Sequence, residues 1–159
     1  MKEATIELIE EKPRLVWKKI LVPIDFSELS KQAIKAAVFL AKQFNAKIIL
    51  LHVVDLSNVG SVETGIAVYE LMESARRSLD ELVAEIPTTL IGEKIVCLSA
   101  GGVSQKIVET ARRLSSDLIV LASHAYGFFK RLFLGSTTEG VNRYAPCEVL
   151  VLRQKPINQ

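Results

Sequence analysis

The chain has 159 residues, of which 49% are apolar and 24% are charged, and its formal net charge at pH 7 is +2. This length suits one domain with a substantial core, and the composition is that of a globular protein, which excludes an intrinsically disordered chain. The small net charge gives no electrostatic support for nucleic-acid binding. We therefore expect one folded domain that does not act on DNA or RNA.

The first residues carry acidic side chains where a signal peptide would need an apolar core. No uninterrupted apolar segment approaches the ~20 residues of a membrane span, so we expect a cytoplasmic protein without membrane contact. The two cysteines, Cys97 and Cys147, belong to no Cys-x-x-Cys pair. We expect them to be buried free thiols rather than parts of a zinc or redox site.

Residues 1–17 lie outside the pattern of the rest of the chain. Ile6 and Leu8 alternate with polar neighbours, which allows a short extra strand, whereas Pro13 and the acidic residues favour a loosely held arm. Both interpretations stay open at this point.

From Lys18 onward, short apolar runs alternate with amphipathic helical patterns. The predicted strands cover residues 18–23, 47–53, 93–99, 118–122 and 149–152. Helices are predicted over 29–44 and 66–86, around Ile107 to Leu114, and from Ser136 onward. This βαβαβαβαβ order predicts an α/β fold of the Rossmann-like kind, an open parallel sheet of five strands in the order 3-2-1-4-5 with helices on both faces.

Two helix starts carry recognisable capping patterns. Ser27 or Asp25 is the expected N-cap of the first helix. Ser136 and Glu139 have the spacing of a capping box at the last helix. On the second helix, Glu73 with Arg77 and Arg76 with Asp80 are predicted as solvent-exposed ion pairs four residues apart.

In a sheet of this order a ligand sits outside the carboxyl ends of strands one and four, where the winding direction reverses. The loops that meet there are residues 23–25 and 122–136, with Val53 nearby. The start of the last helix brings unpaired backbone N–H groups to the same place, so the predicted chemistry is anion binding.

Four stretches then show a resemblance. Residues 20–28 (ILVPIDFSE), 48–55 (IILLHVVD), 117–125 (DLIVLASHA) and 134–152 (LGSTTEGVNRYAPCEVLVL) resemble, in this order, the universal stress protein family. The resemblance covers about Lys18 to Arg153. It implies a family domain over 18–153, an N-terminal arm over 1–17, a C-terminal tail over 154–159, and a role in the stress response.

The ATP-binding branch of that family carries a signature of Gly, two residues, Gly, nine residues, and then Gly-Ser or Gly-Thr. In this chain the signature falls on Ala122, Ala125 and Gly135–Ser136, so its spacing is kept while alanine replaces the first two glycines. The resemblance implies ATP as the cofactor, with Mg²⁺ held through Asp25 if the metal is present. The implied contacts are Pro23, Ile24, Asp25, Val53, Ala122, Ser123, His124, Ala125, Gly127, Lys130, Gly135, Ser136, Thr137 and Thr138.

Several of these residues have a plain structural alternative. Asp25 either contacts ribose or magnesium or caps the first helix, and the capping box of Ser136 and Glu139 would occupy amides that phosphate needs. Lys130 and Arg131 either pair with phosphate or form a solvated turn. His124 fits a ligand contact or a structural residue better than a catalytic base, because the chain has only two histidines and His52 lacks an obvious partner.

Three functions follow from these features. The leading one is a dimeric stress-response regulator that binds an adenine nucleotide and is not an enzyme, although slow ATP hydrolysis is compatible with it. The dimer is predicted through the apolar edge strand Val149–Leu152. The alternative is a scaffold that has lost nucleotide binding, favoured by the two alanines and by the apolar loop Phe128–Leu134. An ATP-hydrolysing or adenylyl-transferring enzyme is third, because the chain lacks a phosphate-binding loop of the Gly-x-x-x-x-Gly-Lys type and a Ser-Gly-Gly-x-Asp-Ser stretch after the first strand.

Overall fold

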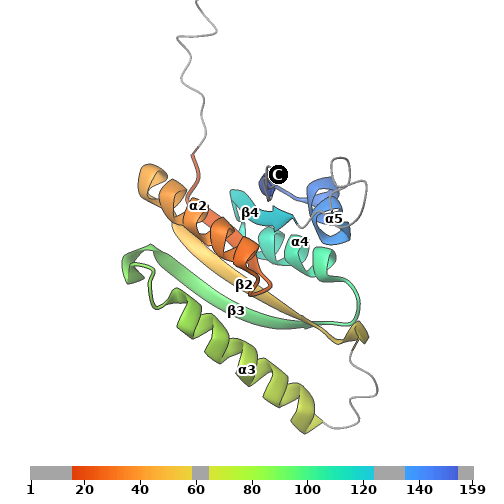
Figure 1. Ribbon diagram of the computed structural model, residues 1–159. Coiled ribbons are helices and arrows are strands. Elements are labelled where there is room, and N and C mark those ends of the chain that lie inside the picture. The colour runs from red at the N-terminus through yellow and green to blue at the C-terminus, as the bar shows by residue number, and fades with distance from the viewer. Residues whose placement is uncertain (1–15, 59–64, 124–134, 154–159) are drawn as a thin grey trace, which may run out of the picture.

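The structure is a computed structural model that describes residues 16–58, 65–123 and 135–153. Most of the predicted N-terminal arm, the predicted tail, residues 59–64 of the loop after the second strand and the apolar loop Phe128–Leu134 lie outside the described residues. Within them, five strands alternate with helices (Figure 1). The elements are β1 (Lys19–Ile24), α2 (Glu28–Phe44), β2 (Lys47–Asp55), η1 (Leu56–Asn58), α3 (Gly65–Val83), η2 (Thr88–Leu90), β3 (Ile91–Ser99), α4 (Val103–Leu114), β4 (Leu118–Ser123), α5 (Ser136–Tyr144) and β5 (Glu148–Arg153).

All strand pairings are parallel, and the sheet order is β3-β2-β1-β4-β5. This confirms the predicted fold class and strand order. Parallel neighbours need crossover connections, and here a helix lies in each crossover. β1 and β5 both pair with β4, so the topological reversal falls between β1 and β4 as predicted.

Helices cover both faces of the sheet and divide the core in two. On one face α2 and α3 bury side chains such as Ala37 and Leu79 against β1, β2 and β4. On the other face α4 and α5 contribute Ile107 and Val141. α4 and α5 lie next to each other (Figure 1). Because both faces are covered, the central strands read as continuous apolar runs, and Ile20 to Val22 are fully buried.

The ends of α2 show how local residues set the boundaries. Ser27 has extended backbone geometry, and its hydroxyl accepts a hydrogen bond from the backbone N–H of Ser30 at 3.1 Å, so Ser27 is the N-cap of the two predicted candidates. At the other end Asn45 adopts the left-handed conformation with φ 52°, which asparagine tolerates, and the chain turns into β2.

Three smaller expectations were wrong. Arg76 pairs with Glu73, three residues away, and Asp80 pairs with Lys94 of β3 rather than with Arg76. Both cysteines are free, but they are half-buried rather than fully buried. Separately, no helix in residues 16–58, 65–123 and 135–153 is long and apolar enough to span a membrane.

Candidate functional site

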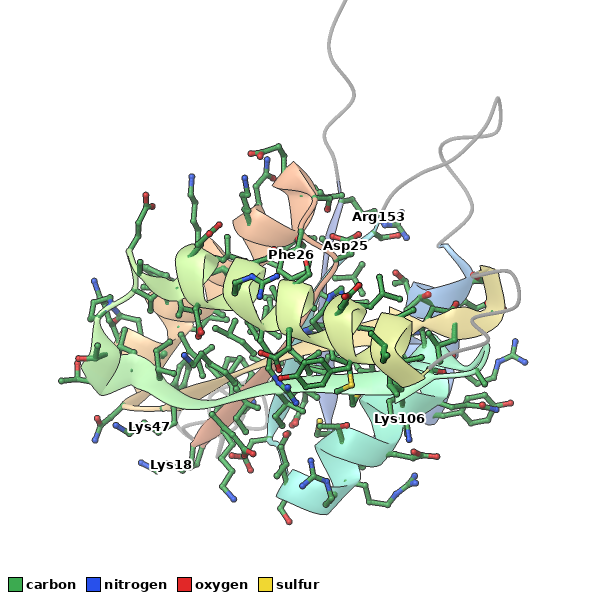
Figure 2. All side chains as sticks on the ribbon, turned by 90° about the horizontal axis from the view of Figure 1, so that it is seen from below. Lys18, Asp25, Phe26, Lys47, Lys106 and Arg153 are labelled. Carbon is green, nitrogen blue, oxygen red and sulfur yellow. The ribbon has the colours of Figure 1, made fainter. Side chains whose placement is uncertain are left out.

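A pocket of about 290 Å³ opens at the carboxyl ends of β1, β2 and β4. Its position is the one expected for a ligand in an open parallel sheet, beside the point where the strand order reverses. Figure 2 shows Asp25 and Phe26 beside each other and well apart from Lys18 and Lys47. The lining residues are Pro23, Ile24, Asp25, Ser30, Leu51, His52, Val53, Val103, Ile107, Leu121, Ala122, Gly135, Ser136, Thr137 and Thr138.

The corner between β1 and α2 forms one wall of this pocket. Asp25 Oδ1 accepts hydrogen bonds from the backbone N–H of Ser27 at 3.0 Å and from its hydroxyl at 2.6 Å. Ser27 in turn caps α2, and the buried hydroxyl of Ser30 donates to Ser27 O at 2.9 Å. The two roles considered for Asp25 are therefore not exclusive, because it braces the helix cap and also lines the pocket.

His52 holds the same corner from the neighbouring strand. Its Nδ1 lies 2.8 Å from the carbonyl oxygen of Ile24, and its ring lies against that of Phe26, with ring centroids 4.4 Å apart. The expectation that His52 lacks a partner was wrong. The partner was hidden because the parallel register, which sets Ile24 opposite His52, is a property of the sheet.

The start of α5 forms the wall opposite the β1 corner. Its N-cap is Gly135, and among the described residues no side chain makes a capping hydrogen bond there, so the predicted capping box of Ser136 and Glu139 is wrong. The helix already begins at Ser136, which places the serine inside the first turn rather than before it. Glu139 points elsewhere and pairs with Arg143 at 3.2 Å. Glu139 therefore does not cap the first backbone N–H groups of α5. The residues that carry these groups, Ser136 to Thr138, line the pocket.

The structure brings most of the predicted contact residues together. Pro23, Ile24, Asp25, Val53, Ala122, Gly135, Ser136, Thr137 and Thr138 all line the pocket. Ser123 is buried at the end of β4 and is not among the lining residues. His124, Ala125, Gly127 and Lys130, with the neighbouring Arg131, lie outside the described residues. Their predicted contacts with phosphate stay predictions.

Sequence analysis missed a further part of the lining. Val103 and Ile107 enter from α4, while Ser30, Leu51 and Leu121 come from elements already assigned to the site. The signal for α4 was the Gly101–Gly102 corner after β3, which ends at the same edge of the sheet as β1. These side chains make much of the pocket apolar, as is typical of sites that take a flat organic group.

The backbone at Ala122 shows whether alanine is strained at the first position of the altered glycine signature. Positive φ among the described non-glycine residues occurs at Phe26, Asn45 and Ser115, and not at Ala122. An alanine at this position therefore carries no left-handed backbone strain. Its methyl group matters only through the space it occupies at the half-buried end of β4.

Comparison with known proteins agrees with the fold and the motifs. The sequence profile of the universal stress protein family, Usp, matches residues 17–153. The chain belongs to the universal stress protein family. Universal stress protein MJ0531 of Methanocaldococcus jannaschii is 34% identical over 143 residues, which cover 87% of this chain and 84% of the relative.

Solved structures of universal stress proteins and their relatives share this architecture. The hypothetical protein MJ0577 is 30% identical with a TM-score of 0.77, and the match covers 89% of this chain and 99% of that one. A universal stress protein from Archaeoglobus fulgidus, solved in complex with dAMP, has a TM-score of 0.61 at 17% identity, with 86% and 98% of the two chains covered. At that identity the likeness concerns the fold alone.

Proposed function

We propose that this universal stress protein binds an adenine nucleotide, ATP with or without Mg²⁺, in the pocket at the carboxyl end of the sheet. In this proposal the protein is a dimeric, cytoplasmic regulator of a stress response. The observation that carries the proposal is the first turn of α5. Gly135, Ser136, Thr137 and Thr138 line the pocket, and no side chain in the described part of the chain caps the helix there.

A helix N-terminus of this kind favours phosphate for two reasons. Its unpaired N–H groups donate to phosphate oxygens, and the helix dipole places partial positive charge at the same end. Gly135 adds no side chain that would stand between phosphate and backbone. The Thr138 residue is 3% exposed and lines the pocket, so its hydroxyl is a candidate further donor from within the site.

The opposite part of the pocket suits a base and a ribose. Pro23 and Val53 present apolar surface, while Asp25 offers a carboxylate beside them. A flat aromatic base with a hydroxylated sugar matches that combination of surfaces. The Archaeoglobus fulgidus protein in complex with dAMP is a precedent for an adenine nucleotide within this fold.

We propose binding without turnover. Within the described residues, no group of three His, Cys, Asp or Glu side chains is placed to hold a metal ion. Mg²⁺ would then arrive with the nucleotide, held mainly by its phosphate oxygens, with Asp25 as the protein ligand. Slow hydrolysis of bound ATP would still be compatible with a binding protein.

The proposed dimer uses β5. Within residues 16–58, 65–123 and 135–153 this strand pairs only with β4 and forms an edge of the sheet. Its apolar residues stay partly accessible, with Leu150 36% exposed. An apolar edge strand offers unpaired backbone groups to a second copy of the same strand. A two-fold axis would pair the strand Val149–Leu152 of two protomers antiparallel.

The second candidate function is a scaffold that acts through protein contacts without nucleotide. The observation that favours it is the first half of α3, where Ile66 is 71% exposed, Tyr69 63% and Leu71 38%. Apolar side chains gathered on one accessible helix segment are typical of protein-binding surfaces.

Two measurements separate these candidates. Purified protein is denatured and its supernatant is run on an ion-exchange column, and ATP with Mg²⁺ is then titrated calorimetrically into stripped, refolded protein. We expect saturable binding. Binding should weaken several-fold in Thr138→Val, which removes the hydroxyl but keeps the shape, and should not change in Thr88→Val, which makes the same change at an exposed site. If the supernatant contains no nucleotide and the titration gives no heat at millimolar ATP, the nucleotide-binding proposal fails and the scaffold function remains.

A further inference from the structure

His52 makes a contact with the β1–α2 corner that its strand position does not require. In the parallel ladder Ile24 stands opposite His52, and the His52 side chain returns to bond the Ile24 carbonyl oxygen from Nδ1 at 2.8 Å. A carbonyl oxygen only accepts hydrogen bonds, so Nδ1 carries the proton in this contact. The last carbonyl of β1 is thereby tied to β2 by a side chain.

The same imidazole supports an unusual backbone conformation. Phe26 has φ 63°, in the left-handed region, and its ring lies 4.4 Å from the His52 ring, tilted by 39°. The other described non-glycine residues with positive φ, Asn45 and Ser115, are helix C-caps, where this conformation is common. For a bulky residue such as phenylalanine it is an outlier that persists only when surrounding contacts hold it.

Asp25 lies between these two anchored residues. His52 holds Ile24 on one side through a hydrogen bond and Phe26 on the other through ring packing. Both Ile24 and Asp25 line the pocket, so the position of this pocket wall depends on the imidazole of a different strand. If the imidazole were lost, the strained backbone at Phe26 would relax and carry Asp25 with it.

We propose that His52 is a positioning residue for the bound nucleotide, which it serves by locking the Ile24–Ser27 corner in the shape that faces the ligand. This inference rests on the proposed nucleotide binding for its ligand. It adds that the hydrogen bond from Nδ1 contributes more to preforming the wall of the site than the packing of the ring against Phe26 does. Preformed contacts raise affinity because less conformational freedom is lost on binding.

Three substitutions of His52 distinguish the effect of the Nδ1 hydrogen bond from the effect of the bulk of the ring. Asparagine places an amide N–H donor close to the position of Nδ1, glutamine places one near Nε2, and leucine removes the donor altogether. We expect His52→Leu and His52→Gln to weaken binding of ATP with Mg²⁺ about tenfold in calorimetric titration. His52→Asn should stay within about threefold of the wild-type affinity, since one neutral hydrogen bond is kept.

A spectroscopic measurement tests the corner without any nucleotide. In ¹⁵N NMR spectra of the wild-type protein, Nδ1 of His52 should carry the proton, and the amide resonances of Asp25 and Phe26 should move in His52→Leu much more than in His52→Asn. Equal ATP affinity in all three variants, or an unprotonated Nδ1, would overturn the inference. Lack of ATP binding by wild type would instead overturn the proposed function, and the amide shifts would still decide whether His52 holds the corner.

Discussion

Gly140 of α5 faces Ser104 of α4 with no room for a side chain. A Cβ atom placed on Gly140 would lie 2.5 Å from Ser104 Oγ and 2.7 Å from Ser104 Cβ. Val103, the neighbour of Ser104, lines the pocket, as does the first turn of α5. The contact between Gly140 and Ser104 therefore sets the spacing of two helices whose N-termini border the site.

We expect Gly140→Ala to destabilise the protein by about 1–3 kcal/mol, the usual range for overpacking a close contact. Helix propensity alone predicts the opposite sign, since alanine is favoured over glycine by up to ~1 kcal/mol inside a helix. The steric term should win, because the clash involves the Cβ of a helical residue. Urea denaturation measures the difference, and ATP titration should show weaker binding as α5 is displaced.

A double substitution provides the matched control for that expectation. Ser104→Gly removes both clashing atoms, so Gly140→Ala combined with Ser104→Gly should recover most of the stability that Gly140→Ala loses. Ser104→Ala keeps the Cβ that lies 2.7 Å from the added methyl group, and it should rescue far less. Equal rescue by alanine and glycine would show that the close contact is not the cause.

Restoring glycine at position 122 should strengthen nucleotide binding. Ala122 has an ordinary backbone conformation, so the change relieves no strain and acts only by removing a methyl group from the pocket wall. Glycine inside a strand should lower the free energy of unfolding by roughly 0.5–1 kcal/mol. The expected signature of Ala122→Gly is a lower Tm together with tighter ATP binding. Ala122→Val should weaken binding, and unchanged affinity in both variants would place the ligand elsewhere.

The two cysteines should make the free energy of unfolding fall as the pH rises through the alkaline range. Burial, helped by the carboxylates of Glu148 and Asp117, raises the pKa of the Cys147 thiol from 9.0 to about 11. Burial also raises the pKa of Cys97. Because the pKa is higher in the folded state, the unfolded chain releases these protons at lower pH than the folded protein does. The stabilisation of the folded state by the protonated thiols is therefore fully present below pH 9 and is lost between about pH 9 and 11.

Urea denaturation at pH 8 and pH 10.5 measures this loss. Wild type should lose more stability between the two values than Cys147→Ala, because the variant has no thiol at that position to ionise. The same burial predicts slow labelling of native protein by iodoacetamide at pH 8 and rapid labelling after unfolding. Rapid labelling of Cys147 in the native state would contradict this account.

A charge introduced on the β5 edge should dissociate the proposed dimer into monomers. Leu150 is 36% exposed on that strand, and Leu150→Lys would bring two like charges together across a two-fold axis. We expect a monomeric mass for this variant by light scattering at micromolar concentration. Phe39→Lys is the matched control, because Phe39 is 63% exposed on α2, a helix that packs on β4, β1 and β2. A monomeric mass for the wild-type protein would remove the dimer altogether.

The fold was largely predictable because it depends on a repeating pattern. Apolar runs alternating with amphipathic helices point to a parallel sheet, and the handedness of crossovers leaves few strand orders. Local patterns set some boundaries as well. Ser27 caps α2 and Asn45 ends it because the chemistry of these residues acts within one turn of the chain.

The details of the site were less predictable because they depend on contacts between distant segments. The Ser136 spacing matched a capping box, yet the helix starts one residue earlier than that motif needs, with Gly135 as the cap. His52 gained its partner only from the register between β1 and β2. Asp80 pairs with Lys94 of β3, which no spacing rule within α3 could reveal.

The two outer strands of the sheet differ in a way that bears on assembly size. β3 carries the exposed Gly92, Glu93 and Lys94 early in its length, whereas β5 presents mainly aliphatic residues. If two copies joined through β5, the apolar edge strand of each would be covered. The edges left exposed would be the two β3 strands, whose charged residues resist the addition of further strands. Self-association would thus terminate at a closed pair, and no fibre could grow from it.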